Sequence, residues 1–328
     1  MHDAPVIFAL NGSRELGKSI AIDLGIALSE HEERDFEHGE HKTRPLTEVG
    51  NRDVYVVHSL QGEEGASAND KLVRLLFFIG ALKDAGARRV TAITPYLAYS
   101  RKDRRTKPRD PVNSRYTACL FEAVQTDRLV TIEVHNISAF ENAFRTCRPE
   151  HVSLVRLFAE ALVSDLSEGA VSVVSPDAGG NKRAELFRHE LERSLGQPVG
   201  KAIMDKHRSA GVVSGETFAG GVAGSTSIIL DDLISSGGTI VRACKAAREA
   251  GATSVIAVAA HAMFDADSLL FGPDGPDQIV VSDTVSLPVD LPPAAREKIG
   301  VIEVGPLIAA VVARLNSGEP VSELLPYD

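Results

Sequence analysis

SIILDDLISSGGTIVRACKAA, residues 227–247, is the stretch of the sequence that most strongly indicates the fold. Its apolar start predicts a buried strand that ends in Asp231 and Asp232, and the pattern after the Ser/Gly turn predicts a helix. Ligands bind at the carboxyl ends of strands in open α/β sheets, and free N–H groups at a helix N-terminus bind phosphate. The stretch therefore predicts a phosphate turn over residues 235–239, whose glycines let the backbone approach a ligand.

Other predicted strands also end in polar side chains. Asp177 follows the strand in VVSPDAGG, and Glu133 and His135 end the strand RLVTIEVH, where alternation places both on one face. Asp231 and Asp232 suit sugar hydroxyls or a divalent cation, because carboxylates do not bind phosphate directly. We interpret Asp177 and His135 as candidate metal or substrate groups, with a turn-forming acid and a structural histidine as the alternatives.

Two segments are positively charged, although the formal net charge of the chain is -10. Residues 94–114, TPYLAYSRKDRRTKPRDPVNS, follow a buried strand and suit a polyphosphate. Lys206 and Arg208 precede a segment rich in glycine, IMDKHRSAGVVSGETFAGGVAGS, which is typical of a mobile lid. A solvated charged loop and a disordered segment are the respective alternatives.

Apolar runs alternate with amphipathic helical patterns along most of the 328 residues, which predicts a parallel α/β fold. A polar passage at residues 142–151 interrupts the alternation, and the length favours two domains of about 150 residues each. We expect a first domain over residues 1–147, a second over residues 148–290, and a terminal helix and tail over residues 291–328 that pack on the first domain. The similar phrases LKDAGARRVTAITPY and AREAGATSVIAVAAH indicate two related halves.

The composition excludes several classes of protein. With 44% hydrophobic and 24% charged residues, and with no apolar run of membrane length, the sequence is typical of a globular protein. The N-terminus lacks the pattern of a secretory signal, so we predict a cytoplasmic location. The negative net charge argues against a general nucleic-acid binder. The spacing of Cys119, Cys147 and Cys244 predicts neither a disulfide framework nor a zinc site.

A second phosphate motif has to be weighed near the N-terminus. Gly12, Gly17, Lys18 and Ser19 have the spacing of a P-loop, and a predicted strand precedes them. However, Leu16 is in phase with later apolar residues, so we predict that a helix begins before Gly17, with Ser13 as its N-cap. Lys18 would then be an exposed side chain, and we reject the P-loop interpretation.

Taken together, the segments resemble the ribose-phosphate pyrophosphokinase (PRPP synthetase) family over nearly the whole chain. The matching phrases, in order, are FEHGE (36–40), TPYLAYSRKDRR, EVHN, SPDAGG, DKHR, DDLISSGGT and PLIAAVVARLNSGEPVSELL. The resemblance implies two tandem phosphoribosyltransferase-like domains, each a mainly parallel sheet flanked by helices. DDLISSGGT alone would fit any phosphoribosyltransferase, whereas the ordered set is specific.

The family makes PRPP for nucleotide biosynthesis by transferring the β,γ-diphosphoryl group of ATP to the anomeric hydroxyl of ribose 5-phosphate, with Mg²⁺. The resemblance implies ATP on the first domain, ribose 5-phosphate on the second, and a homo-oligomer built from dimers, such as a hexamer. By position, the implied residues are Phe36, His38, Glu40, Arg101, Lys102 and Asp103 for ATP; His135 and Asp177 for the metal; Lys206 and Arg208 for catalysis; and Asp231, Asp232, Ser235, Ser236, Gly237, Gly238 and Thr239 for ribose 5-phosphate.

Several positions depart from the common pattern of the family. His38 replaces an acid, Lys102 replaces a glutamine, and Glu133 replaces the usual aspartate. The phosphate turn resembles that of the archaeal-type branch. His38 and Lys102 lie where the nucleotide should bind, so an altered donor or acceptor, a non-catalytic relative and a phosphoribosyltransferase are the alternatives.

Overall fold

The structure is a computed structural model that describes residues 4–166, 169–209 and 212–326, without the side chains of residues 205–217. The chain divides into two compact units. The first contains the residues up to Val152 together with Val304–Leu325, and the second contains Ser153–Glu303. Each unit is described by itself below.

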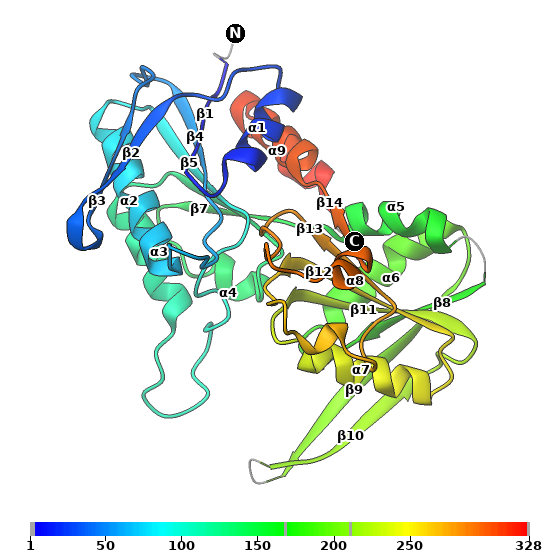
Figure 1. The fold of residues 1–328 in the computed structure, drawn as a ribbon. Coiled ribbons are helices and arrows are strands. Elements are labelled where there is room, and N and C mark those ends of the chain that lie inside the picture. Colours follow the sequence, from blue (N-terminus) through cyan, green and yellow to red (C-terminus); the bar gives the residue numbers. More distant parts are fainter. Residues whose placement is uncertain (1–3, 167–168, 210–211, 327–328) are drawn as a thin grey trace. The chain divides into compact units, whose positions relative to one another are not determined.

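The first unit is built on a parallel sheet with the strand order β1-β4-β5-β6-β7 (Figure 1). Alternating apolar runs form its buried strands, and the helices cover them with their apolar faces. The elements are β1 (Val6–Ala9), α1 (Arg14–Asp23), β2 (His31–Asp35), β3 (His41–Pro45), β4 (Asp53–Val57), α2 (Ala68–Asp84), β5 (Arg89–Thr94), α3 (Asn113–Ala123), β6 (Arg128–Ile132), α4 (Ile137–Glu141), β7 (Arg148–Val152) and α9 (Gly305–Ser317), with 3₁₀ turns at Glu37–Gly39 and Val321–Leu324.

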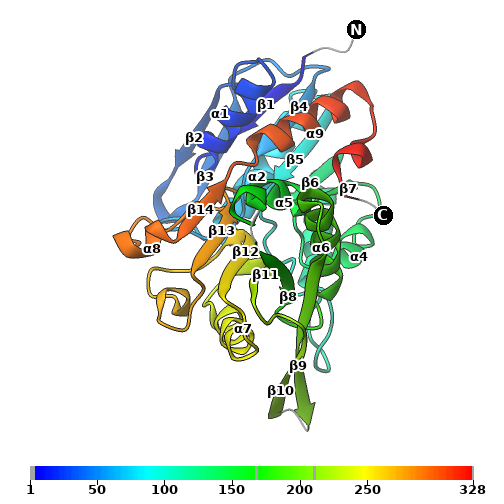
Figure 2. The same cartoon turned by 90° about the vertical axis from the view of Figure 1, so that its right-hand side faces the viewer.

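The second unit contains a sheet with the order β10-β9-β8-β11-β12-β13-β14, in which only the β9–β10 pair is antiparallel among the described strands. Its elements are α5 (Val155–Leu166), β8 (Ala170–Ser175), α6 (Asn181–Leu195), β9 (Val199–Ser209), β10 (Val212–Gly220), β11 (Ser225–Ile234), α7 (Gly238–Glu249), β12 (Ser254–Ala262), a 3₁₀ turn (Leu269–Phe271), β13 (Gln278–Ser282), α8 (Pro293–Glu297) and β14 (Ile299–Ile302). Figure 2 shows β9 and β10 extending beyond the rest of this sheet.

The two units share one order of elements. The first runs β1, α1, the antiparallel pair β2–β3, β4 and α2, and the second runs β8, α6, the antiparallel pair β9–β10, β11 and α7. Ser29, just before β2, donates its N–H to the carbonyl of Ile7 in β1 (2.7 Å), so β2 starts beside β1 as β9 lies beside β8. By this order α2 corresponds to α7.

Helix α1 begins at Arg14, so Gly17 lies inside it, as the sequence predicts. A Cβ on Gly17 would lie only 2.2 Å from the Cβ of Ala9 in β1, so this glycine serves close helix–strand packing. Lys18 pairs at the surface with Glu15 at 2.7 Å. Ser13 occupies the N-cap position, but its hydroxyl accepts the N–H of Ser59 (2.9 Å) instead of capping the helix.

Three local predictions from the sequence are wrong or incomplete. The helical pattern toward Leu28 is not followed, because α1 ends at Asp23 and Gly25 has a positive φ of 67°. The polar passage at residues 142–151 contains the start of β7, which pairs with β6 and extends the first unit to Val152. The glycine-rich segment after Arg208 contains the strand β10, which the sequence did not indicate, and its role as a lid stays a prediction.

The terminal helix α9 belongs to the first unit and contacts α1. Gly305 at its start approaches so closely that a Cβ there would lie 2.1 Å from the Oγ of Ser19. No helix in the described part of the chain is long and apolar enough to cross a membrane.

Candidate functional site

In the second unit, the strand β11 carries Asp231 and Asp232 toward its carboxyl end. Asp232 is buried, with 4% of its surface exposed, and its backbone N–H donates to Oδ1 of Asp231 (2.9 Å). Burial raises the pKa of Asp231 well above its usual value, and the neighbouring carboxylate of Asp232 raises it further. Two carboxyls in this setting need a cation or hydroxyl donors to stay ionised.

Arg183, in the first turn of α6, supplies positive charge to this acidic pair. Its Nη1 lies 3.3 Å from Oδ1 of Asp232 and 3.9 Å from Oδ1 of Asp231, and it lowers the pKa of Asp231 against the effect of burial. Arg183 is not among the residues predicted from the sequence, although its place just after the glycines of SPDAGG, at a helix start beside a strand-end acid, is a usable signal.

The predicted phosphate turn follows the two acids directly. Gly237 is the N-cap residue of α7 with a φ of 80°, and no described side chain caps this helix. A Cβ on Gly237 would lie 2.7 Å from Cγ of Leu270 and 2.9 Å from Oγ of Ser268, so both the backbone conformation and the space require glycine. Ser235 and Ser236 are exposed, and the first N–H groups of α7 are therefore available to an anion.

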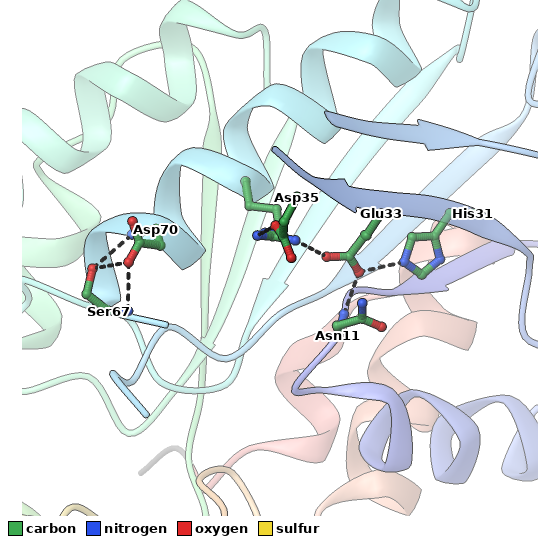
Figure 3. A network of polar contacts seen from close by, with 7 residues as sticks. Asn11, His31, Glu33, Asp35, Ser67 and Asp70 are labelled. Carbon is green, nitrogen blue, oxygen red and sulfur yellow. Dashed lines mark hydrogen bonds and ion pairs between the residues drawn. The ribbon is translucent and has the colours of Figure 1, made fainter. Parts of the chain in front are cut away.

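The corresponding helix of the first unit, α2, has a closed N-terminus. Ser67 accepts the N–H of Asp70 (3.2 Å), and the carboxylate of Asp70 accepts the N–H of Ser67 (2.8 Å), which forms a capping box (Figure 3). These hydrogen bonds lower the pKa of Asp70, so the helix end already has its own negative charge. Of these two corresponding helix starts, only that of α7 lacks a side-chain cap among the described residues.

Asp177 lies between β8 and α6, at the same edge of the second sheet as the turn after β11. Its Oδ1 accepts the N–H of Gly180 (3.0 Å), and its carbonyl accepts the hydroxyl of Ser175 (2.7 Å). Its second carboxylate oxygen forms no hydrogen bond within the described residues. The structure therefore brings Asp177, Asp231, Asp232 and the phosphate turn to one sheet edge.

In the first unit, the segment FEHGE forms the tip between β2 and β3. Phe36 is 43% exposed, with the guanidinium of Arg34 at 5.1 Å from its ring centre, and its N–H donates to the carbonyl of Glu40 (2.7 Å). His38 and Gly39 both have positive φ, 66° and 86°. A strained non-glycine residue at an exposed tip with an aromatic side chain is typical of a ligand-binding loop.

A buried ionic network ties this tip to α2 (Figure 3). Oε1 of Glu33 accepts the N–H of Asn11 (2.6 Å) and lies 2.8 Å from Nε2 of His31, while Arg74 of α2 donates to Oε2 of Glu33 (3.0 Å) and also pairs with Asp35. Burial would raise the pKa of Glu33, but these hydrogen bonds lower it from 4.5 to about 2. The network therefore stabilises the folded state above about pH 4.5, and this contribution is lost as the pH falls toward 2.

In the positively charged loop after β5, residues 95–112, several groups bind Asp110 of the same loop. Nζ of Lys102 lies 2.8 Å from Oδ2 of Asp110, which also accepts the N–H groups of Thr106 and Lys107 (both 3.0 Å), and these contacts hold the pKa of Asp110 far below its usual range. Asp103 accepts a hydrogen bond from Asn136 (2.6 Å). Arg101 is exposed. Lys102 thus shapes the loop, whereas Arg101 remains available to a ligand.

Glu133 and His135 do not lie on one strand face, and that prediction is wrong. Strand β6 ends at Ile132, and Glu133 is buried with a φ of 40°, which breaks the alternation before His135 is reached. His135 is exposed in the bend that follows. A positive φ at a buried non-glycine residue is a strained conformation of the kind that clusters at functional sites.

Lys206 and Arg208 lie on β9, whose backbone pairs Lys206 with Glu216 and Arg208 with Val213 of β10. Their side chains lie outside the described residues. His135 belongs to the first unit and Asp177 to the second, so each of these two predicted metal ligands is placed only within its own unit.

Comparison with known proteins shows two family models that match different parts of the chain. Residues 5–124 match the family model for the N-terminal domain of ribose phosphate pyrophosphokinase, and residues 205–326 match that for the phosphoribosyl synthetase-associated domain. The chain is 32% identical over 320 residues to a ribose-phosphate pyrophosphokinase of Listeria ivanovii, which covers 97% of this chain and 96% of the relative. Ribose-phosphate pyrophosphokinase 1 of Streptococcus mutans is 31% identical over 326 residues, with 98% and 97% covered.

A solved structure gives the same result for the fold. The phosphoribosylpyrophosphate synthetase from Mycobacterium smegmatis matches with a TM-score of 0.84 and 29% identity, over 96% of this chain and 100% of that chain. The predicted fold class, two tandem mainly parallel α/β domains, is confirmed.

Proposed function

The chain belongs to the ribose-phosphate pyrophosphokinase family, and from this we propose that it transfers the β,γ-diphosphoryl group of ATP to the anomeric hydroxyl of ribose 5-phosphate, giving PRPP and AMP. The anomeric oxygen forms a bond to the β-phosphorus, and the bond from that phosphorus to the oxygen bridging to the α-phosphate breaks. AMP is the leaving group. This family identity was predicted from the sequence and is confirmed.

The observation that carries the proposal is the succession of two acids and an open helix N-terminus on β11 and α7. The uncapped N–H groups around Gly237 suit the 5-phosphate, and the carboxylates of Asp231 and Asp232 suit the ribose hydroxyls. The residues assigned to ribose 5-phosphate are Asp231, Asp232, Ser235, Ser236, Gly237, Gly238 and Thr239. We accordingly assign the sugar phosphate to the C-terminal domain.

We assign ATP to the N-terminal domain. The exposed ring of Phe36 suits the base, and the exposed cation of Arg101 suits the phosphates. The remaining residues proposed for ATP are assigned only by their place in the motifs shared with the family: His38, Glu40, Lys102 and Asp103. Because Lys102 is engaged with Asp110, its contribution to ATP binding is indirect, through the shape of the loop.

Mg²⁺ fits the residues of this chain as a cofactor held jointly with substrate. Within the described residues, no group of three or more His, Cys, Asp or Glu side chains forms a metal cage. Mg²⁺ is usually bound by one or two carboxylates together with substrate phosphates and water, and Asp177 keeps one oxygen for such a role. We propose a metal-binding role for His135 in the first unit and for Asp177 in the second. When bound, Mg²⁺ would neutralise charge on the phosphate oxygens.

The transfer itself requires positioning and cations more than covalent chemistry. The ribose phosphate would be positioned by the turn after β11. Arg183 lowers the pKa of Asp231 and so favours its ionised form, which accepts hydrogen bonds from the sugar hydroxyls. Lys206 and Arg208 are the proposed catalytic cations, which would offset charge on the diphosphoryl group in the transition state. We also propose a cytoplasmic homo-oligomer, as the family implies.

The test of this function is a donor and acceptor screen with product identification by mass spectrometry. ATP with ribose 5-phosphate is expected to give AMP and PRPP in equal amounts. Because His38 and Lys102 lie on the nucleotide side, the screen includes other nucleoside triphosphates and other sugar phosphates. Absence of AMP with every pair would overturn the proposal, and consumption of PRPP with a free base would identify a phosphoribosyltransferase.

Replacing Arg183 by methionine is expected to shift the acid limb of the pH profile of kcat/KM for ribose 5-phosphate to higher pH. Arg183 lowers the pKa of Asp231, so its removal lets the acidic pair keep a proton to higher pH. Arg183→Lys keeps the charge and should leave the limb near its original position. Lys182→Met, at the exposed neighbouring position, is the control. Superimposable profiles for Arg183→Met and the unaltered protein would contradict the assignment.

Replacing Arg74 by methionine is expected to raise KM for ATP about tenfold and to leave KM for ribose 5-phosphate unchanged. The change removes the cation that joins Glu33 and Asp35 to α2 and so loosens the tip that carries Phe36. Steady-state kinetics for both substrates measures the effect. Arg44→Met on the same ribbon, which breaks only the surface pair with Glu32, is the matched control. An unchanged KM for ATP would rule out this positioning role.

A further inference from the structure

Three arginines lie in a row along the amino-terminal edge of the first sheet. Arg89, Arg128 and Arg148 are the first residues of β5, β6 and β7, which are neighbours in the sheet (Figure 2). Arg128 and Arg148 are direct partners in the β6–β7 register. The loop that carries Arg101, Lys102 and Asp103, which are assigned to ATP, follows the opposite end of β5, about 16 Å away at ~3.3 Å per residue.

The arginines differ in how they are neutralised. Arg89 is held by Asp53, with Nε 2.8 Å from Oδ1, and by the carbonyl of Leu315. The guanidinium groups of Arg128 and Arg148 form no hydrogen bond or ion pair with any described residue. Like charges directly opposite each other on adjacent strands are destabilising, so this pair calls for a counter-ion.

The nearby carboxylates are occupied elsewhere or poorly ionised. Asp127 pairs with Lys83 (2.8 Å) and accepts the N–H of Val90 (2.7 Å). Glu122 accepts the backbone N–H groups of residues 145, 146 and 147. Burial raises the pKa of Glu150, although Arg128 and Arg148 act to lower it, and Glu150 pairs with neither arginine in the described chain.

These side chains surround a cavity of about 500 Å³. Its lining includes four cations and the two acids Glu122 and Asp127, whose carboxylates are engaged as described above, together with Thr126, which is 3% exposed; the cations are Arg128, Arg148, Lys83 and Arg89. The buried hydroxyl of Thr126 has no hydrogen-bond partner among the described residues. A cavity of this volume falls in the range of small-molecule sites and exceeds what a single ion fills. It combines positive charge with an unsatisfied hydroxyl group.

We propose that this cavity binds the phosphate group of a small phosphate monoester, with Arg128 and Arg148 as the paired guanidinium ligands. Planar guanidinium groups bind phosphate oxygens through two parallel hydrogen bonds, and two of them side by side match the charge of a dianion. The site lies at the edge of the sheet opposite the loop of residues 101–103 and uses none of the residues assigned to ATP. It is a binding site additional to those of the two substrates.

The test is protection from arginine modification by phenylglyoxal, with each arginine quantified by peptide mass spectrometry. Glycerol 3-phosphate, a simple monoester, is expected to slow labelling of Arg128 and Arg148 about tenfold at ten times its Kd. Inorganic phosphate in a second series shows how much of the binding comes from the phosphate group alone. Chloride at equal ionic strength is the control for screening. Arg145, exposed nearby but outside the cavity lining, is the internal control.

Two variants separate this site from the substrate sites. Arg128→Gln is expected to abolish protection of Arg148, because the two side chains bind one phosphate group. Gly237→Ala, altered in the turn assigned to ribose 5-phosphate, is expected to retain full protection, whatever its catalytic activity. Equal labelling of Arg128 and Arg148 with and without either phosphate compound would overturn the proposal. So would loss of their protection in Gly237→Ala, since it would place the bound phosphate at the substrate turn.

Discussion

Gly237→Ala is expected to raise KM for ribose 5-phosphate about 100-fold, which corresponds to about 3 kcal/mol of lost binding. Gly237 has a φ of 80°, and an added Cβ would collide with Leu270 and Ser268. The turn can relieve the collision only by moving the N–H groups at the start of α7, which are the groups proposed to bind the 5-phosphate. Steady-state kinetics and isothermal titration with ribose 5-phosphate measure the loss.

The control for this variant is Gly221→Ala in the same unit. A Cβ on Gly221 meets no atom within 4 Å, so this substitution should change neither KM nor the melting temperature noticeably. Gly237→Ala is expected to stay folded, because a single strained residue costs about 1–3 kcal/mol. A folded Gly237→Ala protein with unchanged affinity for ribose 5-phosphate would show that the phosphate binds elsewhere.

Lys206→Ala is expected to lower kcat about a thousandfold while the Kd for ribose 5-phosphate changes little. A cation that contacts the diphosphoryl group mainly in the transition state contributes to kcat rather than to substrate binding, and removal of one such group typically costs this much. Rapid-quench measurement of AMP formation gives the rate of the chemical step, and titration gives the Kd.

Lys201→Ala is the matched control, because Lys201 lies on the same strand but pairs with Glu185 at 2.6 Å. Loss of this partly exposed pair should leave kcat within about twofold. Turnover of Lys206→Ala equal to that of Lys201→Ala would remove Lys206 from the catalytic assignment. A parallel loss of ribose 5-phosphate binding would instead make it a substrate ligand.

The sequence predicted the parts of the site that depend on local chemistry. Asp231, Asp232 and the glycine turn follow one another in the chain, and the rule that sites form at the carboxyl ends of strands places them together. The rejection of the P-loop was also correct, because the in-phase apolar residues locate the start of α1 ahead of Gly17. Short-range periodicity and glycine chemistry are sufficient for such features.

Features that depend on distant pairs could not be predicted in this way. Its place at a helix start marks Arg183 as a candidate, but its contact with Asp232 spans 49 positions of sequence, and the contact of Arg74 with Glu33 spans 41. Strand β2, HEERD, has no alternating apolar pattern. Its buried side chains are polar instead: His31 and Glu33 contact each other, and Arg74 of α2 pairs with Glu33. Glu133 has a positive φ of 40°, which glutamate rarely adopts, so the local sequence does not predict this conformation.

The shared order of elements in the two units has an evolutionary consequence. A strand, a helix, an antiparallel pair, a second strand and a second helix recur in the same succession, as duplication of one ancestral domain would produce. In one unit the second helix has an open, glycine-lined start, and in the other the Ser67–Asp70 capping box closes it. With the sugar phosphate assigned to the open start of α7, as proposed, the closed start of α2 leaves the antiparallel pair β2–β3, which Arg74 joins to α2, as the corresponding part of the first unit for a different ligand.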